Sequence, residues 1–190
     1  MNKTERPLIV SFQLYVNDLD YIAVRKLILD GFFSTAGSLA NLVLDRYIKT
    51  FLWSIDREDV VKMIKGLGGN DSHDVLQMIE KCKEEGLSVP DLNSEEEKQL
   101  KNIHQCYCFR YIDYMFKTKS NAEMRDNYIH TVDKVAHFYR TRVFENPPQK
   151  GKAPIDLICA GHPIIGTAIT CNRSDCSEIL FLGNKYFCVV

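Results

Sequence analysis

The stretch FFSTAGSLANLVLDRYIKTFLWS, residues 32–54, decides the fold, because its apolar residues recur at helical spacing along its whole length. Eight apolar positions share one wide face: Phe33, Ala36, Ala40, Val43, Leu44, Tyr47, Ile48 and Phe51. A face of this width is typical of a helix enclosed by several others, so we expect the central helix of a bundle here. A polar strip accompanies it: Ser34, Ser38, Asn41, Asp45 and Lys49. Asp45 and Lys49 are spaced for an i,i+4 ion pair.

The neighbouring stretches on both sides also carry helical patterns. Residues 18–30 are expected to form a helix that begins after Asn17 as N-cap and stops at Gly31. A glycine-rich loop at 66–71 precedes another helix, which Asp71 or Ser72 would cap and which would end near residue 85, before Gly86. Both predicted helices would pack against the central one.

Two capping boxes predict the last two helices. Ser94 and Glu97 open a helix that should reach about residue 116, and its second half, CYCFRYIDYMF, is apolar almost all round. Ser120 and Glu123 open a helix over 121–144, NAEMRDNYIHTVDKVAHFYRTRVF. The pattern therefore predicts five helices before Pro147.

The period changes after the breaker-rich linker 146–154. Residues 155–160, 166–170 and 178–190 are expected to form short strands, with a hairpin turn at Gly183 and Asn184. Residues 7–16 are also strand-like and could pair with them. The expected fold class is therefore mainly α: a five-helix up-and-down bundle over 1–146, followed over 147–190 by a linker and a small β appendage.

Composition limits the classes of function. The 190 residues carry 24 basic and 25 acidic side chains, so nucleic-acid binding would have to come from a local patch. No apolar run approaches the roughly 20 residues of a membrane span, and the apolar part of the N-terminus is too short for a signal peptide. Seven cysteines, an odd count without an export signal, suggest a reducing, cytoplasmic setting. Cys171 and Cys176 could bind zinc, but small core residues are the commoner role, and we expect no metal site.

The helix at 121–144 has two chemically different faces. Its apolar stripe is Tyr128, Val132, Val135 and Tyr139. The opposite row is Asp126, His130, Asp133 and His137, which we expect to face solvent or a cleft. This row has the i,i+4 and i,i+7 spacing of metal ligands, although surface pairing such as Asp126 with Lys134 is the commoner explanation.

Residues 18–145 resemble the HEPN domains, which are helical bundles named for nucleotide binding. The resemblance lies in the order of an aromatic residue, small residues and Asp45-Arg-Tyr-Ile-Lys49, then Ser72-His73-Asp74-Val75, then Arg110-Tyr111. Asp45 stands where Glu is usual, Ser72 where Gly is usual and Ile112 where Pro often follows. The resemblance implies a nucleotide groove near Lys49, Arg110 and Tyr111, and a possible homodimer. His137 is a further ligand-binding candidate, whereas His73 and His104 are expected to be structural.

Some HEPN domains are metal-independent ribonucleases with an Arg-x(4–6)-His motif. Arg125-Asp126-Asn-Tyr-Ile-His130 satisfies that pattern, including the polar residue after the arginine. A histidine near neutral pKa can move the 2′-hydroxyl proton, and an arginine can hold the phosphate. On one continuous helix, however, positions 125 and 130 point about 140° apart, so they would need a helix distortion or a second protomer to meet.

The expected function is therefore a nucleotide- or RNA-binding module without catalysis, cofactor or membrane contact. Two alternatives stay open. The first is a ribonuclease that uses Arg125, Asp126 and His130, and the second is a protein-interaction adaptor with an unknown partner.

Overall fold

The computed structural model describes residues 6–111, 113–114, 127–145 and 175–187. These residues are mainly helical, as expected, and none of them lies in a strand. The helices are α1 (Arg6–Leu29), α2 (Phe33–Ser54), α3 (Glu58–Gly66), the 3-10 helix η1 (Asp71–His73), α4 (Val75–Glu84), α5 (Ser94–Cys108), α7 (Ile129–Glu145) and α10 (Asp175–Phe181).

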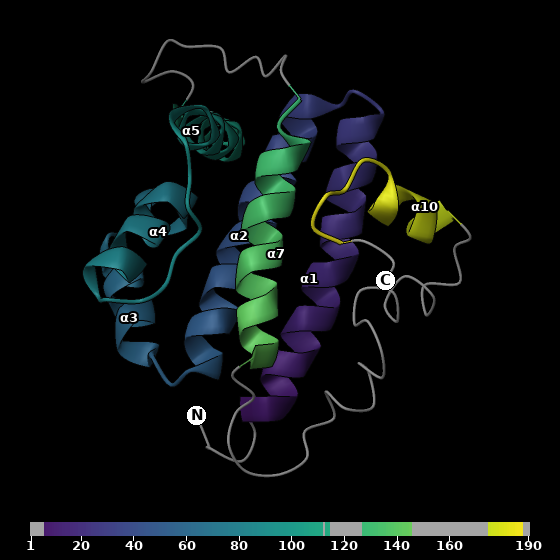
Figure 1. Ribbon diagram of the computed structural model, residues 1–190. Helices are drawn as coiled ribbons and strands as arrows, with labels where there is room; N and C mark the ends of the chain where they lie inside the picture. The colour runs from purple at the N-terminus through teal and green to yellow at the C-terminus, as the bar shows by residue number, and fades with distance from the viewer. Residues whose placement is uncertain (1–5, 112, 115–126, 146–174, 188–190) are drawn as a thin grey trace.

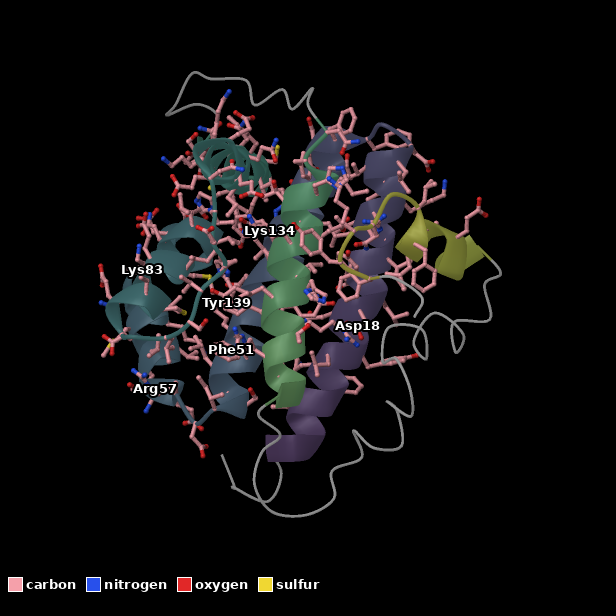
Figure 2. All side chains as sticks on the ribbon, viewed as in Figure 1. Asp18, Phe51, Arg57, Lys83, Lys134 and Tyr139 are labelled. Atoms are coloured by element: carbon pink, nitrogen blue, oxygen red, sulfur yellow. The ribbon has the colours of Figure 1, made fainter. Side chains whose placement is uncertain are left out.

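Helix α2 is central, as its wide apolar face predicts. It contacts α1, α3, α4, α5 and α7. In Figure 1 the long helices α1, α2 and α7 run side by side, α3, α4 and α5 cover one flank, and α10 lies against α1 on the other. The predicted apolar stripe is fully buried: Val132, Val135 and Tyr139 of α7, and Tyr128 just before it. The Phe51 and Tyr139 rings meet between α2 and α7 with centroids 5.5 Å apart (Figure 2).

The turn from α1 to α2 depends on Gly31, which has a φ of +83°. The Phe32 amide donates to the Leu27 carbonyl at 2.8 Å, and the Gly31 amide donates to the Ile28 carbonyl at 3.0 Å. These bonds form a Schellman motif, in which the glycine adopts the left-handed conformation that side chains disfavour. The predicted stop at Gly31 is confirmed.

The start of α1 corrects two expectations. Residues 7–16 are helical, not a strand, and Asn17 is a buried residue inside the helix instead of its N-cap. Val10 and Leu14 are four residues apart and both buried, so they extend the same face that packs on α2. Burial against α2 outweighs the strand propensity of this β-branched and aromatic stretch.

The region between α2 and α5 holds one helix that the sequence pattern did not predict, and two helix starts that differ from expectation. Helix α3 buries Val60, Val61 and Ile64. Helix α4 is capped by Asp74, whose carboxylate accepts from two backbone amides, and not by Asp71 or Ser72. The capping box of α5 lies one residue earlier than expected, at Asn93 and Glu96, and α5 ends at Cys108 instead of near 116.

A buried polar cluster joins the three long helices. The Asp18 carboxylate of α1 accepts two hydrogen bonds from Arg140 of α7, each 2.9 Å long, and one from the Tyr47 hydroxyl of α2 at 2.6 Å. All three residues are at most 3% exposed. Figure 2 labels Asp18 on α1 beside α7. Because each charge is matched and hydrogen-bonded, this cluster fixes how the three helices meet.

The C-terminal part that the structure describes is helical where a strand was expected. Residues 178–181 belong to α10, which buries Ile179 and Leu180, and a turn follows with Gly183 at a φ of +63°. The chain then buries Phe187, whose ring lies 5.6 Å from that of Tyr21 in α1. The other predicted strands, 155–160 and 166–170, lie outside the described residues. No helix in the described ranges is long and apolar enough to cross a membrane.

Candidate functional site

The polar strip of α2 faces η1 and α5 from Ser38 onward, whereas Ser34 at its start is exposed. The Ser38 hydroxyl donates to the Cys106 carbonyl at 2.6 Å, and the Asn41 amide donates to the His73 carbonyl at 2.8 Å. Asp45 is buried, and its Oδ1 lies 2.5 Å from Lys49 Nζ, which confirms the predicted ion pair. The same oxygen lies 3.5 Å from His73 Nδ1. The strip therefore brings residues from α2 and η1 into one polar contact.

Tyr107 of α5 extends this contact toward the surface. Its ring centroid lies 5.3 Å from that of His73 and 6.3 Å from that of Tyr111. The Arg110 guanidinium carbon sits 4.0 Å from the Tyr107 centroid, in a cation–π contact. Tyr111 is 48% exposed. We call Asp45, Lys49, His73, Tyr107, Arg110 and Tyr111 the Tyr107 cluster.

The electrostatics of the Tyr107 cluster follow mainly from burial. Burial raises the pKa of Tyr107 to about 12, so this hydroxyl stays protonated near neutral pH. Burial also lowers the pKa of His104, although Asp74 and Asp71 act in the opposite direction. His104 Nε2 lies 3.3 Å from the Cys108 sulfur, inside α5. The neutral Tyr107 hydroxyl thus lies among one carboxylate, Asp45, and two cations, Lys49 and Arg110.

A groove adjoins the cluster at Lys49, between α1, α2 and α3. Its volume is about 180 Å³. Its lining residues are Val10, Gln13, Arg46, Lys49, Thr50, Trp53, Val61 and Lys65. Three of these residues are cations and none is a carboxylate. We call this the Trp53 groove.

Two of the three cations of the Trp53 groove form ion pairs with carboxylates. Arg46 Nη1 is 2.5 Å from Asp20, and Lys49 is paired with Asp45. Lys65 is exposed and makes no ion pair with any residue that the structure describes. Three cations against two carboxylates leave a surplus of one positive charge at the groove.

The Asp/His row of the last long helix does not form one surface. Asp133 is fully buried and pairs with Arg25, and it accepts a 2.5 Å hydrogen bond from the Tyr21 hydroxyl. Burial raises the pKa of the Asp133 carboxyl, with Arg25 acting in the opposite direction. Arg25 also donates to the carbonyls of Ile179 and Leu182, at 2.9 and 2.5 Å. Asp133 therefore braces the contact with the C-terminal segment, and the expectation that it faces solvent or a cleft is wrong.

The other members of the row lie in different surroundings. His130 is exposed in the first turn of α7. The His137 ring packs against Tyr186 and Phe187, with centroids 5.7 and 5.0 Å away. His137 is therefore separated from Lys49, Arg110 and Tyr111, which gather at the Tyr107 cluster.

Helix α7 begins later than the helix predicted over 121–144. The helix begins at Ile129, whose amide donates to the Asn127 side chain at 3.0 Å, and residues 127 and 128 are not helical. The expected continuous helix over 121–144 is wrong at this point, so Arg125 and His130 are not fixed 140° apart on one helix. Arg125 and Asp126 themselves, like the capping box at Ser120, lie outside the described residues.

Sequence analysis missed Arg46, Trp53 and Lys65 as site residues. The groove needs α3 as its third wall, and α3 was not predicted. The sequence does carry a signal for α3. Glu58 and Asp59 precede an apolar set at 60, 61 and 64, as in the first turn of an amphipathic helix. Arg46, Lys49 and Trp53 also share one side of α2, at spacings of three and four residues.

Comparison with known proteins assigns no family to this chain. No protein-family model matches the chain, and neither the curated proteins nor the solved structures include a significant match. Within the described ranges, no group of three or more His, Cys, Asp or Glu side chains is arranged to hold a metal ion. Cys171 lies outside those ranges and the side chain of Cys176 is not described, so the zinc pairing stays untested. The candidate site is therefore the surface formed by the Tyr107 cluster and the Trp53 groove, joined at Lys49.

Proposed function

We propose that this chain is a HEPN-like module that binds a nucleotide or RNA across α2, at Lys49, without catalysis. The observation that carries the proposal is the gathering of Lys49, Arg110 and Tyr111 at one cluster. Lys49 is far in the sequence from the adjacent pair Arg110 and Tyr111, and the resemblance to HEPN domains assigned all three to a nucleotide groove.

The chemistry of the cluster suits such a ligand. Lysine and arginine bind phosphate oxygens, and arginine does so with a fork of N–H donors. The exposed Tyr111 ring and the face of the Arg110 guanidinium offer surfaces on which a base can stack. The local surplus of positive charge meets the condition set by the near-neutral composition of the whole chain.

Binding without a chemical step is the function that these groups support best. Asp45 contacts the His73 ring, but no hydroxyl or thiol is hydrogen-bonded to that ring among the residues described. The cluster thus has groups that hold an anion and a ring, and it lacks a paired nucleophile and base.

The test is thermal stabilisation by nucleotides and by single-stranded RNA in EDTA. A ligand at 100 times its Kd adds about 2.7 kcal/mol to the free energy of unfolding, which raises the melting temperature by about 5–10 °C in a chain of this size. Arg110→Ala and Tyr111→Ala should reduce the saturable shift. Lys98→Ala is the control, because Lys98 is an exposed cation on α5, the helix that precedes Arg110, and lies outside the cluster. If no nucleotide or RNA raises the melting temperature, the binding proposal is wrong and the adaptor function takes its place.

Metal-independent RNA cleavage is the second candidate function, and one observation favours it. Because α7 begins at Ile129, His130 sits exposed at the start of a helix that does not continue through 127 and 128. RNA cleavage in EDTA that disappears in both Arg125→Ala and His130→Ala would establish this activity. His130→Ala should change the free energy of unfolding by no more than about 0.5 kcal/mol, because His130 is exposed.

A further inference from the structure

We infer that the Trp53 groove holds a single nucleoside monophosphate, with its base against Trp53 and its phosphate at Arg46, Lys49 and Lys65. This inference rests on the proposed nucleotide-binding function and specifies its ligand and its site. It concerns three lining residues, Arg46, Trp53 and Lys65, that the sequence pattern did not single out.

The walls of the groove favour a flat, apolar group. Val10, Trp53 and Val61 form its apolar part, from α1, α2 and α3 respectively. Trp53 is partly buried and packs against the hydrophobic core, so its ring is held in place while one part of it lines the groove. Aromatic side chains bind bases of any sequence by stacking, since every base has a π face.

The size of the groove favours one base. Its volume of about 180 Å³ is below the range of about 300–1,000 Å³ that is usual for drug-sized ligands. A single base can therefore be enclosed, whereas the sugar and the phosphate must lie at the mouth. Gln13 and Thr50 add uncharged polar groups to the lining.

The charges at the groove favour one phosphate. The surplus of one positive charge, after the pairs of Arg46 with Asp20 and Lys49 with Asp45, is closer to a phosphomonoester of about −1.5 to −2 than to a triphosphate. The two carboxylates also hold their cations in position before the ligand arrives, which lowers the entropy cost of binding. Arg46 contacts Asp20 through Nη1, and a guanidinium has five N–H donors in total, so donors remain for a phosphate.

Lys65→Ala is the variant that tests the phosphate contact with the least effect on the fold. Lys65 lines the groove from α3, it is exposed, and it has no ion-pair partner among the described residues. Replacing it with alanine therefore removes a phosphate contact without breaking a contact of the fold. Lys62, on the same helix, is also exposed but does not line the groove, which makes Lys62→Ala the matched control.

The experiment uses the fluorescence of Trp53, which is the only tryptophan in the chain. The full-length protein is titrated with AMP, UMP, adenosine, inorganic phosphate and ATP in EDTA. We expect a saturable change of emission with AMP and with UMP, and mutual competition between them. Adenosine and phosphate alone should each bind at least 10-fold more weakly than AMP. Lys65→Ala should weaken AMP binding about fivefold, the upper range of an exposed charge contact, and Lys62→Ala should leave it unchanged.

The outcomes separate this inference from the proposed function. If nucleotides or RNA raise the melting temperature but leave the Trp53 emission unchanged, the proposed function stands and the assignment to this groove is wrong. Equal affinity for adenosine and AMP, or tighter binding of ATP than of AMP, overturns the assignment of a single monophosphate. Equal effects of Lys65→Ala and Lys62→Ala overturn the role of Lys65. If no ligand changes either signal, both the function and the inference are wrong.

Discussion

Asp18→Asn should be among the most damaging conservative substitutions in this protein. The change keeps the shape of the side chain but removes the charge that Arg140 faces across two 2.9 Å hydrogen bonds. Asp18 and Arg140 are 2% and 3% exposed, so the guanidinium cannot turn to water. Removing one side of a buried ion pair costs about 3–5 kcal/mol, because the remaining buried charge loses the carboxylate that balances it.

This loss is large against the total stability of an ordinary domain, about 5–15 kcal/mol. It corresponds to a fall of about 6–20 °C in melting temperature, at about 2–4 °C per kcal/mol for a chain of this length. The assay is urea unfolding followed by circular dichroism at the helical minimum. The double variant Asp18→Leu, Arg140→Met should regain most of the loss, since both buried charges are then absent.

Two results would refute this reasoning. The first is a loss below about 1 kcal/mol in Asp18→Asn, which is the range of an exposed pair and would mean that α1 and α7 do not meet through these residues. The second is a double variant whose loss equals the sum of the single losses, since independent sites add and a pair in contact does not. Tyr47→Phe is a useful companion, because it removes only the 2.6 Å hydrogen bond to Asp18.

Three further predictions concern single residues. Burial lowers the pKa of His104 below its ordinary value of 6.5 in the folded chain, so the unfolded chain binds the proton more readily. The free energy of unfolding should therefore fall as the pH drops below about 6.5, and this slope should be smaller in His104→Gln. Asn17→Leu should raise the free energy of unfolding by about 1–3 kcal/mol in urea titrations, because both amide atoms of Asn17 are buried without a hydrogen-bond partner among the described residues; a loss would mean that Asn17 has a partner. Gly31→Ala should lower the free energy of unfolding by about 1–2 kcal/mol, with a matching fall in melting temperature. The cause is the φ of +83° alone, since no atom lies within 4 Å of the added methyl group. An unchanged melting temperature would contradict the left-handed turn.

Local signals in the sequence predicted the centre of this fold well. The wide apolar face of α2 and the stop at Gly31 depend on neighbouring residues, and both appear in the structure as expected. The strand-like stretches at 7–16 and 178–182 failed for a common reason. Their β-branched and aromatic residues favour strands in isolation, but Val10, Leu14 and Leu180 become buried at helical contacts made by other parts of the chain.

Long-range pairing explains what could not be predicted about the site. Asp133 was assigned to an open face because nothing near it in sequence marks it as buried. Its partner Arg25 lies 108 positions away, and Arg25 in turn contacts carbonyls more than 150 positions away. The gathering of Lys49 with Arg110 and Tyr111 could be anticipated only from the family resemblance, since no spacing in the chain implies it.

The most direct test of the central claim is to locate a bound nucleotide by photocrosslinking. The full-length protein is irradiated with 4-thiouridine monophosphate and with a short RNA that carries 4-thiouridine, and the crosslinked peptides are identified by mass spectrometry. Nucleotide binding across α2 predicts crosslinks in peptides that contain residues 46–53 or 107–111, suppressed by excess unmodified UMP. Crosslinks confined to residues 127–145, or crosslinks that excess UMP does not suppress, would contradict it.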